Sequence, residues 1–210
     1  MALPARQANR TAPVTDPRKA AFDAVRAISR PDLFNDPGNV LALDNLLDAF
    51  GAPRMSATTS IPDDYWPMLS KIESNDRPYI KAATSSASGL YQFIRATWIG
   101  EGGKWGNDMG QAFGGLRPPV SEQLARAKTF TEKNAAALRA KGIPINKASL
   151  YAAHFFGAGM AAKVIGADVN ARADLIAGEA ATKANPSILR GKTVGQFLTW
   201  LHGKTGEWAR

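Results

Sequence analysis

The sequence predicts a mainly α-helical protein. Apolar residues recur at helical spacing in several segments, as Tyr65, Leu69 and Ile72 do. Residues typical of helix ends bracket such segments: Ser121 precedes a long amphipathic stretch and Gly142 follows it. No stretch shows the strong alternation of apolar and polar residues that marks a half-buried strand. These three observations indicate a fold of α-helices, with at most a short β element in the loops after residue 73 or residue 103.

The first 58 residues are predicted to form a separate segment. Residues 1–15 are polar and contain two prolines, which indicates an arm. Asp16 as N-cap and Pro17 as first helical residue predict a short helix, whose apolar stripe is Phe22, Val25 and Ile28. A second helix is predicted over residues 40–50, with an apolar face of Leu43, Leu46, Leu47 and Phe50. A linker of small residues follows, so residues 1–58 are interpreted as an attachment element.

Residues 59–210 are predicted to form the main domain. Its first helix is expected over residues 63–74, with Asp63 or Asp64 at its start. A Ser-rich loop leads to a second helical segment at 89–102, and a Gly-rich loop covers 106–119. Further helices are expected over residues 121–142, 146–165 with a break at a glycine, 171–180 and 193–209.

Composition limits the chemistry. The chain of 210 residues has no cysteine and two histidines, which excludes disulfides and thiolate metal sites and argues against a histidine-rich metal cluster. The formal net charge of +8 suits an anionic partner such as nucleic acid, an anionic membrane surface or an acidic wall polymer. Because the basic residues are scattered, a basic surface without a specific polyanion site fits the charge equally well.

The N-terminal residues lack an apolar core of signal-peptide length, and no apolar run is long enough to span a bilayer. We therefore expect synthesis in the cytoplasm without a signal peptide and without a membrane span.

One carboxylate lies beside apolar residues. Trp66 and Leu69 precede Glu73 by seven and four residues, spacings that place all three on one helical face. Burial against Trp and Leu would raise the pKa of the Glu73 carboxyl, and a glutamic acid protonated near neutral pH can act as a general acid. The alternative is that Glu73 ends a helix and points to water.

The Gly-Leu-Tyr-Gln stretch at 89–92 offers groups that suit a sugar. Gly89 would let the backbone approach a ligand closely, Tyr91 provides a stacking face, and Gln92 offers a donor and an acceptor. An N-acetyl sugar has an apolar face and polar edges that match such groups. The alternative is an ordinary helix N-terminus, with Ser86 or Ser88 as cap and the aromatic residues in the core.

These motifs, in this order, resemble the soluble lytic transglycosylase family of lysozyme-like enzymes. The matching pairs are Glu73-Ser74, the Gly-Leu-Tyr-Gln stretch and Thr97-Trp98. The family's third signature, Ala-Tyr-Asn-Ala-Gly, corresponds to residues 152–159, where His154 replaces the tyrosine and Phe155 the asparagine. The resemblance covers residues 61–203, and the form of the third motif looks like a branch of the family found in phage particles.

The resemblance implies a lysozyme-like domain of the goose type that acts on peptidoglycan glycan strands without metal or cofactor. Glu73 would be the catalytic acid and then base, and Ser74 would touch the sugar and steady the carboxylate. Gly89, Leu90, Tyr91 and Gln92 would line the groove, and His154 would stand where the family tyrosine supports the glutamate. The reaction cleaves the β-1,4 bond between N-acetylmuramic acid and N-acetylglucosamine and leaves a 1,6-anhydro product.

The phage-like motif and the N-terminal segment predict a virion enzyme. We expect it to open the host cell wall, on the periplasmic side, for genome entry, with residues 1–58 docked on tail or other virion proteins. The first alternative is a hydrolytic muramidase or endolysin, with Asp76 as a second carboxylate. Another is a structural virion protein with an inactive lysozyme-like domain. Specific nucleic-acid binding ranks last, because the chain lacks a basic helix, an aromatic-basic strand pattern and zinc ligands.

Overall fold

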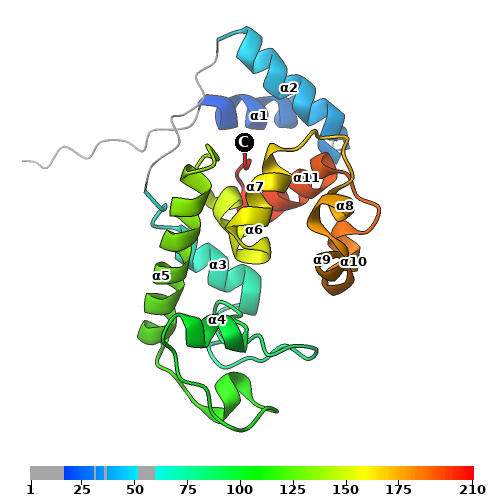
Figure 1. Ribbon diagram of the computed structural model, residues 1–210. Helices are drawn as coiled ribbons and strands as arrows, with labels where there is room; N and C mark the ends of the chain where they lie inside the picture. Colours follow the sequence, from blue (N-terminus) through cyan, green and yellow to red (C-terminus); the bar gives the residue numbers. More distant parts are fainter. Residues whose placement is uncertain (1–16, 31, 36, 52–59) are drawn as a thin grey trace, which may run out of the picture. The chain divides into compact units, whose positions relative to one another are not determined.

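The computed structural model describes residues 17–30, 32–35, 37–51 and 60–210, and it is mainly helical (Figure 1). The chain divides into two compact units, Met1–Ser56 and Ala57–Arg210. The division falls close to the boundary expected near residue 58, in a stretch outside the described residues. The predicted arm and Asp16 also lie outside them.

The first unit contains α1 (Pro17–Ile28), the short 3-10 turn η1 (Leu33–Asn35) and α2 (Pro37–Ala49). Pro17 opens α1, as predicted. Of the predicted stripe on α1, Phe22 is buried and its ring lies 6.2 Å from that of Phe34, whereas Ile28 is 88% exposed. The described part of this unit therefore leaves one end of the stripe in contact with solvent.

The second unit is built from nine helices and one 3-10 turn in its described residues: α3 (Tyr65–Ser74), α4 (Arg95–Gly100), η2 (Ala112–Gly115), α5 (Val120–Arg139), α6 (Lys147–Phe156), α7 (Ala158–Gly166), α8 (Ala173–Ala177), α9 (Glu179–Ala184), α10 (Pro186–Leu189) and α11 (Val194–Thr205). The prediction of a mainly α fold is confirmed. The β structure in these residues consists of isolated bridges, two of which pair Ser88 with Lys81 and Phe93. No helix in the described part of the chain is both long and apolar enough to cross a membrane.

The helix α6 lies at the centre of this unit. It packs on α5, α7 and α11 (Figure 1). Residues 148–153 are all buried. Asn146 caps its start, because the side chain accepts a bond from the backbone N–H of Ser149, 2.8 Å away. The predicted glycine break is Gly157, whose φ of 78° and ψ of 148° end α6 before α7 begins. Residues on α6 thus hold fixed positions relative to three neighbouring helices.

The prediction of a helix over residues 89–102 is wrong for its first half. Only Arg95–Gly100 is helical; residues 89–92 form a tight turn, and Phe93 pairs with Ser88 in a β-bridge. Gly89 and Gln92 have φ values of 79° and 47°, which lie in the left-handed region and interrupt a right-handed helix. The backbone N–H of Ser88 instead donates to the carbonyl of Phe93 at 3.0 Å and closes the turn.

Candidate active site

The carboxyl of Glu73 lies half-buried in the last turn of α3. Burial raises its pKa from the ordinary 4.5 to about 7, because the charged form loses solvation. An interaction with the side chain of Tyr151 and the positive charge of Lys204 lower the pKa, but by less than burial raises it. The carboxyl therefore exchanges a proton near neutral pH, as a general acid and base requires. The sequence suggested this environment from the position of Glu73 beside Trp66 and Leu69.

Three helices supply the groups around this carboxyl: Glu73 comes from α3, Tyr151 from α6 and Lys204 from α11. A second tyrosine, Tyr65, is fully buried near Glu73, and its hydroxyl lies beside Thr131 without a hydrogen bond of normal geometry. Burial and the Glu73 charge raise the pKa of both tyrosines, so both hydroxyls keep their protons. A protonated Tyr151 can donate to the ionised form of Glu73.

Ser74, which was expected to touch the sugar, takes part in the end of α3. Its hydroxyl donates to the carbonyl of Ser70 at 3.0 Å and accepts from the backbone N–H of Arg77 at 3.2 Å. A serine hydroxyl has a single proton to donate. In this arrangement Ser74 can offer a ligand only an acceptor, and the residue is 2% exposed.

Asp76, the candidate second carboxylate, turns back onto α3. Its backbone has a φ of 60°, its Oδ1 accepts from the hydroxyl of Ser70, and its Oδ2 lies 3.7 Å from the Nζ of Lys71. The carboxylate is thus engaged by two groups of α3 and remains partly exposed. Its charge also raises the pKa of Tyr91, after the larger effect of burial.

The Gly-Leu-Tyr-Gln turn is fixed to the core by Gln123 of α5. The Oε1 of Gln123 accepts from the backbone N–H of Leu90 at 2.9 Å, and its Nε2 donates to the carbonyls of Pro78 and Pro118 at 3.0 and 3.1 Å. Gln123 is 1% exposed, so its polar atoms are satisfied by these loops. This residue joins three loops next to the site, and sequence reasoning missed it because a glutamine in an amphipathic helix normally faces solvent.

The turn residues differ in what they present to the surface. Gly89, Leu90 and Tyr91 are buried, the last at 5% exposure, while Gln92 is partly exposed. Gly89 is required by packing, since an added Cβ would lie 2.4 Å from the ring of Phe113. The Nε2 of Gln92 donates to the carbonyl of Gly89 at 2.9 Å, which braces the turn. Of the four residues, Gln92 has the side chain with most access to a ligand.

Alanine substitutions should separate these roles. We expect Tyr91→Ala to lower the free energy of unfolding by about 3 kcal/mol, as for other buried aromatic residues. We expect Gln92→Ala to lower it by about 1 kcal/mol, the contribution of one internal hydrogen bond, and to reduce kcat/KM on the glycan strands that the motifs predict as substrate. Urea unfolding and kinetics on purified peptidoglycan measure both. Equal losses of stability in the two variants would contradict this assignment.

His154 lies among aromatic rings. Its ring centroid is 6.0 Å from those of Phe93 and Phe130, and it stacks on Tyr151 at 6.5 Å. The Nδ1 is buried without a hydrogen-bond partner, and burial lowers the pKa of His154 to about 4, although a bond to the Tyr91 backbone opposes the shift. The imidazole is therefore neutral at neutral pH.

The tyrosine that contacts Glu73 is Tyr151, one turn before His154 on α6. The motif comparison had placed His154 at the supporting position. Residues three apart on a helix share a face, so either side chain could have been directed at the carboxyl. The available signal was the sequence Leu-Tyr-Ala-Ala-His itself, in which a tyrosine precedes the histidine by one turn.

No protein-family model matches the chain, and no curated protein matches it. Among the described residues, no group of three or more acidic or histidine side chains is arranged to hold a metal ion. The functional assignment therefore rests on the environment of Glu73 and on the motifs that lead to it.

Proposed function

We propose that this protein is a peptidoglycan lytic transglycosylase with a lysozyme-like domain, in which Glu73 is the catalytic acid and then the base. The observation that carries the proposal is the carboxyl of Glu73, which is half-buried, interacts with Tyr151 and is raised in pKa to about 7. Strongly shifted pKa values are enriched at catalytic positions. The order of motifs around Glu73 supports the same reaction.

In the proposed reaction Glu73 gives its proton to the glycosidic oxygen as the β-1,4 bond breaks. The substrate's N-acetyl group stabilises the positive charge that develops at the anomeric carbon. The Glu73 carboxylate then takes the proton of the muramyl 6-hydroxyl, whose oxygen bonds to the anomeric carbon and closes the 1,6-anhydro ring. Between these steps the hydroxyl of Tyr151 and the charge of Lys204 stabilise the carboxylate.

The position of Asp76 favours this route over hydrolysis. Hydrolytic glycosidases usually use two carboxylates that flank the scissile bond. Asp76 is bound by Ser70 and Lys71, and the interactions of the Glu73 carboxyl come from α6 and α11 instead. A muramidase that uses Asp76 is the second candidate, and its products would contain free reducing ends.

The activity is tested by clearing of purified peptidoglycan, with Tyr151→Phe as the diagnostic variant. Loss of the hydroxyl removes a bond that lowers the pKa of Glu73, so that pKa should rise and kcat should fall by roughly tenfold or more. Because the acid form is needed first, the decline of kcat/KM toward high pH should move upward in the variant. A folded wild-type protein that leaves peptidoglycan intact would contradict the proposal.

We further propose that residues 1–58 attach the enzyme to a phage particle, where it opens the wall for genome entry. Ile28, Leu46 and Phe50 are at least half exposed in the first unit, as expected of a docking segment. The test is deletion of residues 1–58. The remainder should still clear peptidoglycan but should be missing from purified particles, whereas normal incorporation would contradict attachment.

A further inference from the structure

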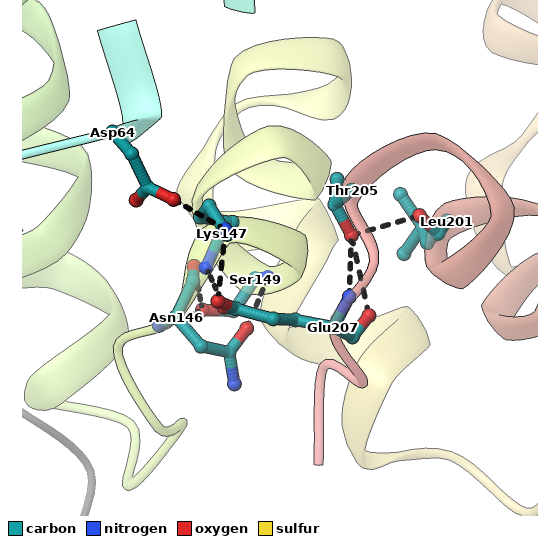
Figure 2. Close-up of polar contacts among 7 residues, drawn as sticks. All are labelled: Asp64, Asn146, Lys147, Ser149, Leu201, Thr205 and Glu207. Atoms are coloured by element: carbon teal, nitrogen blue, oxygen red, sulfur yellow. Dashed lines mark hydrogen bonds and ion pairs between the residues drawn. The ribbon is translucent and has the colours of Figure 1, made fainter. Parts of the chain in front are cut away.

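Lys147, the first residue of α6, lies between two carboxylates (Figure 2). Its Nζ is 2.8 Å from Oδ2 of Asp64 and 3.2 Å from Oε1 of Glu207. Its backbone N–H also donates to Oε2 of Glu207 at 2.8 Å. The Lys147 side chain is 16% exposed; burial alone would lower its pKa, but the two carboxylates outweigh burial and raise it.

Glu207, one of the two partners of Lys147, is held in place by Thr205, the last residue of α11. The hydroxyl of Thr205 accepts from the backbone N–H of Glu207 at 3.3 Å and donates to the carbonyl of Leu201 at 2.9 Å. The other partner, Asp64, immediately precedes α3. Lys147 therefore joins the start of α3, the start of α6 and the end of α11, as Figure 2 shows.

These three helices are the ones that carry the groups around the candidate acid. Tyr151 is four residues after Lys147 and so lies one turn further along the same face of α6. Glu73 follows Asp64 by nine residues, or about 13 Å along a helix. Two side-chain links thus connect α3 with α6: Asp64 with Lys147 at one end, and Glu73 with Tyr151 near the other.

We propose that Lys147 is a positioning residue, which sets α3 and α11 against α6 so that Tyr151 meets the carboxyl of Glu73. Without its ammonium group, nothing would offset the repulsion between the Asp64 carboxylate, whose side chain is 69% exposed, and the Glu207 carboxylate, whose side chain is 34% exposed, and the two would move apart. The start of α3 would then shift away from α6. The kinetic consequence rests on the proposed function, whereas the consequence for the Glu73 pKa does not.

The direct test measures the pKa of Glu73 by NMR titration of its carboxyl carbon in Lys147→Met and Asp64→Asn. The two substitutions remove charges of opposite sign, so direct electrostatics would move the pKa upward in the first and downward in the second. The direct effect of Asp64 is small, because about 13 Å exceeds the Debye length of roughly 8 Å at physiological salt. Loss of positioning weakens the Tyr151 bond in both variants and should raise the pKa in both.

Two further variants sharpen the comparison. Lys147→Arg keeps the positive charge, so the pKa of Glu73 in this variant should stay close to the wild-type value. Lys133→Met is the matched control, because it also removes a lysine from an ion pair. The Nζ of Lys133 in α5 lies 2.9 Å from Oε2 of Glu101, the residue after α4, so this pair joins elements that do not carry Glu73. We expect Lys147→Met to lower kcat by roughly tenfold, with little change in KM, because misplaced catalytic groups slow the chemical step. Lys133→Met should leave kcat and the Glu73 pKa unchanged.

The outcomes decide between positioning by Lys147, a direct electrostatic effect on Glu73 and a merely structural role. Shifts of the Glu73 pKa in opposite directions for the two charge variants would show direct electrostatics and overturn the inference. A lower melting temperature with an unchanged Glu73 pKa in both variants would make Lys147 merely structural and also overturn it. If Lys147→Met does not fold, Asp64→Asn decides alone: a raised pKa of Glu73 supports positioning by Lys147, and a pKa of Glu73 that does not rise overturns it. A wild-type protein without activity would defeat the proposed function, and the NMR pKa values would still decide the role of Lys147.

Discussion

Glu73→Gln is expected to abolish peptidoglycan cleavage while the protein stays folded. The amide keeps the size of the side chain and can still accept from Tyr151, but it cannot give and retake a proton. Loss of a positioned acid or base typically costs about 10²–10⁴-fold in rate, and here one residue serves both steps. Turnover of purified peptidoglycan measures the loss, with far-ultraviolet circular dichroism as the control for folding. Activity near the wild-type rate would show that Glu73 is not the acid.

The same variant should gain stability at alkaline pH. The pKa of Glu73 is higher in the folded protein, about 7, than its ordinary value of 4.5, so the folded state binds the proton more tightly. The stabilising contribution is present below pH 4.5 and is lost as the pH rises through about 7. The substituted amide stays neutral throughout, so the melting temperature of the variant should exceed that of wild type at about pH 8 and match it near the ordinary pKa of 4.5. A lower melting temperature under the alkaline condition would contradict the burial of this carboxyl.

Gly89→Ala is expected to destabilise the second unit by about 3 kcal/mol or more, by two additive causes. Holding a residue with a Cβ at the left-handed φ of 79° costs roughly 1–2 kcal/mol. The added Cβ would also lie 2.4 Å from the ring of Phe113 and 2.5 Å from Oε1 of Gln123. Overpacking of this kind typically costs about 1–3 kcal/mol more.

Gly142→Ala separates the two causes. Gly142 has a similar φ of 69°, but nothing lies within 4 Å of an added Cβ. Gly142→Ala should therefore lower the free energy of unfolding only by the roughly 1–2 kcal/mol that a left-handed φ costs a residue with a Cβ. Urea unfolding of both variants gives the comparison, and equal losses would show that the turn at Gly89 can move away from Phe113.

The helices were predictable where periodicity and end signals agree. The long apolar segment with its glycine break became α6 and α7, and the amphipathic stretch before Gly142 became α5. The start of the 89–102 segment was not predictable, because one of its two left-handed residues, Gln92, is not a glycine and its turn is closed by pairing of Phe93 with Ser88. The short helix α10 was missed as well, since four residues contain too little pattern to interpret.

The candidate site was only partly predictable for a related reason. Glu73 could be singled out because its helical neighbours are apolar and adjacent in sequence. Tyr151 and Gln123 act through contacts between distant segments, which no local pattern encodes. His154 drew attention as a titratable residue on an apolar helix, yet it is the neighbouring tyrosine that contacts the carboxyl.

Mass spectrometry of the muropeptides released from purified peptidoglycan tests the central proposal most directly. A single catalytic carboxyl that acts as acid and then base predicts products ending in 1,6-anhydromuramic acid. The Glu73→Gln variant should release none of these products. Products with free reducing ends, heavier by the mass of one water, would show hydrolysis and contradict the transglycosylase assignment.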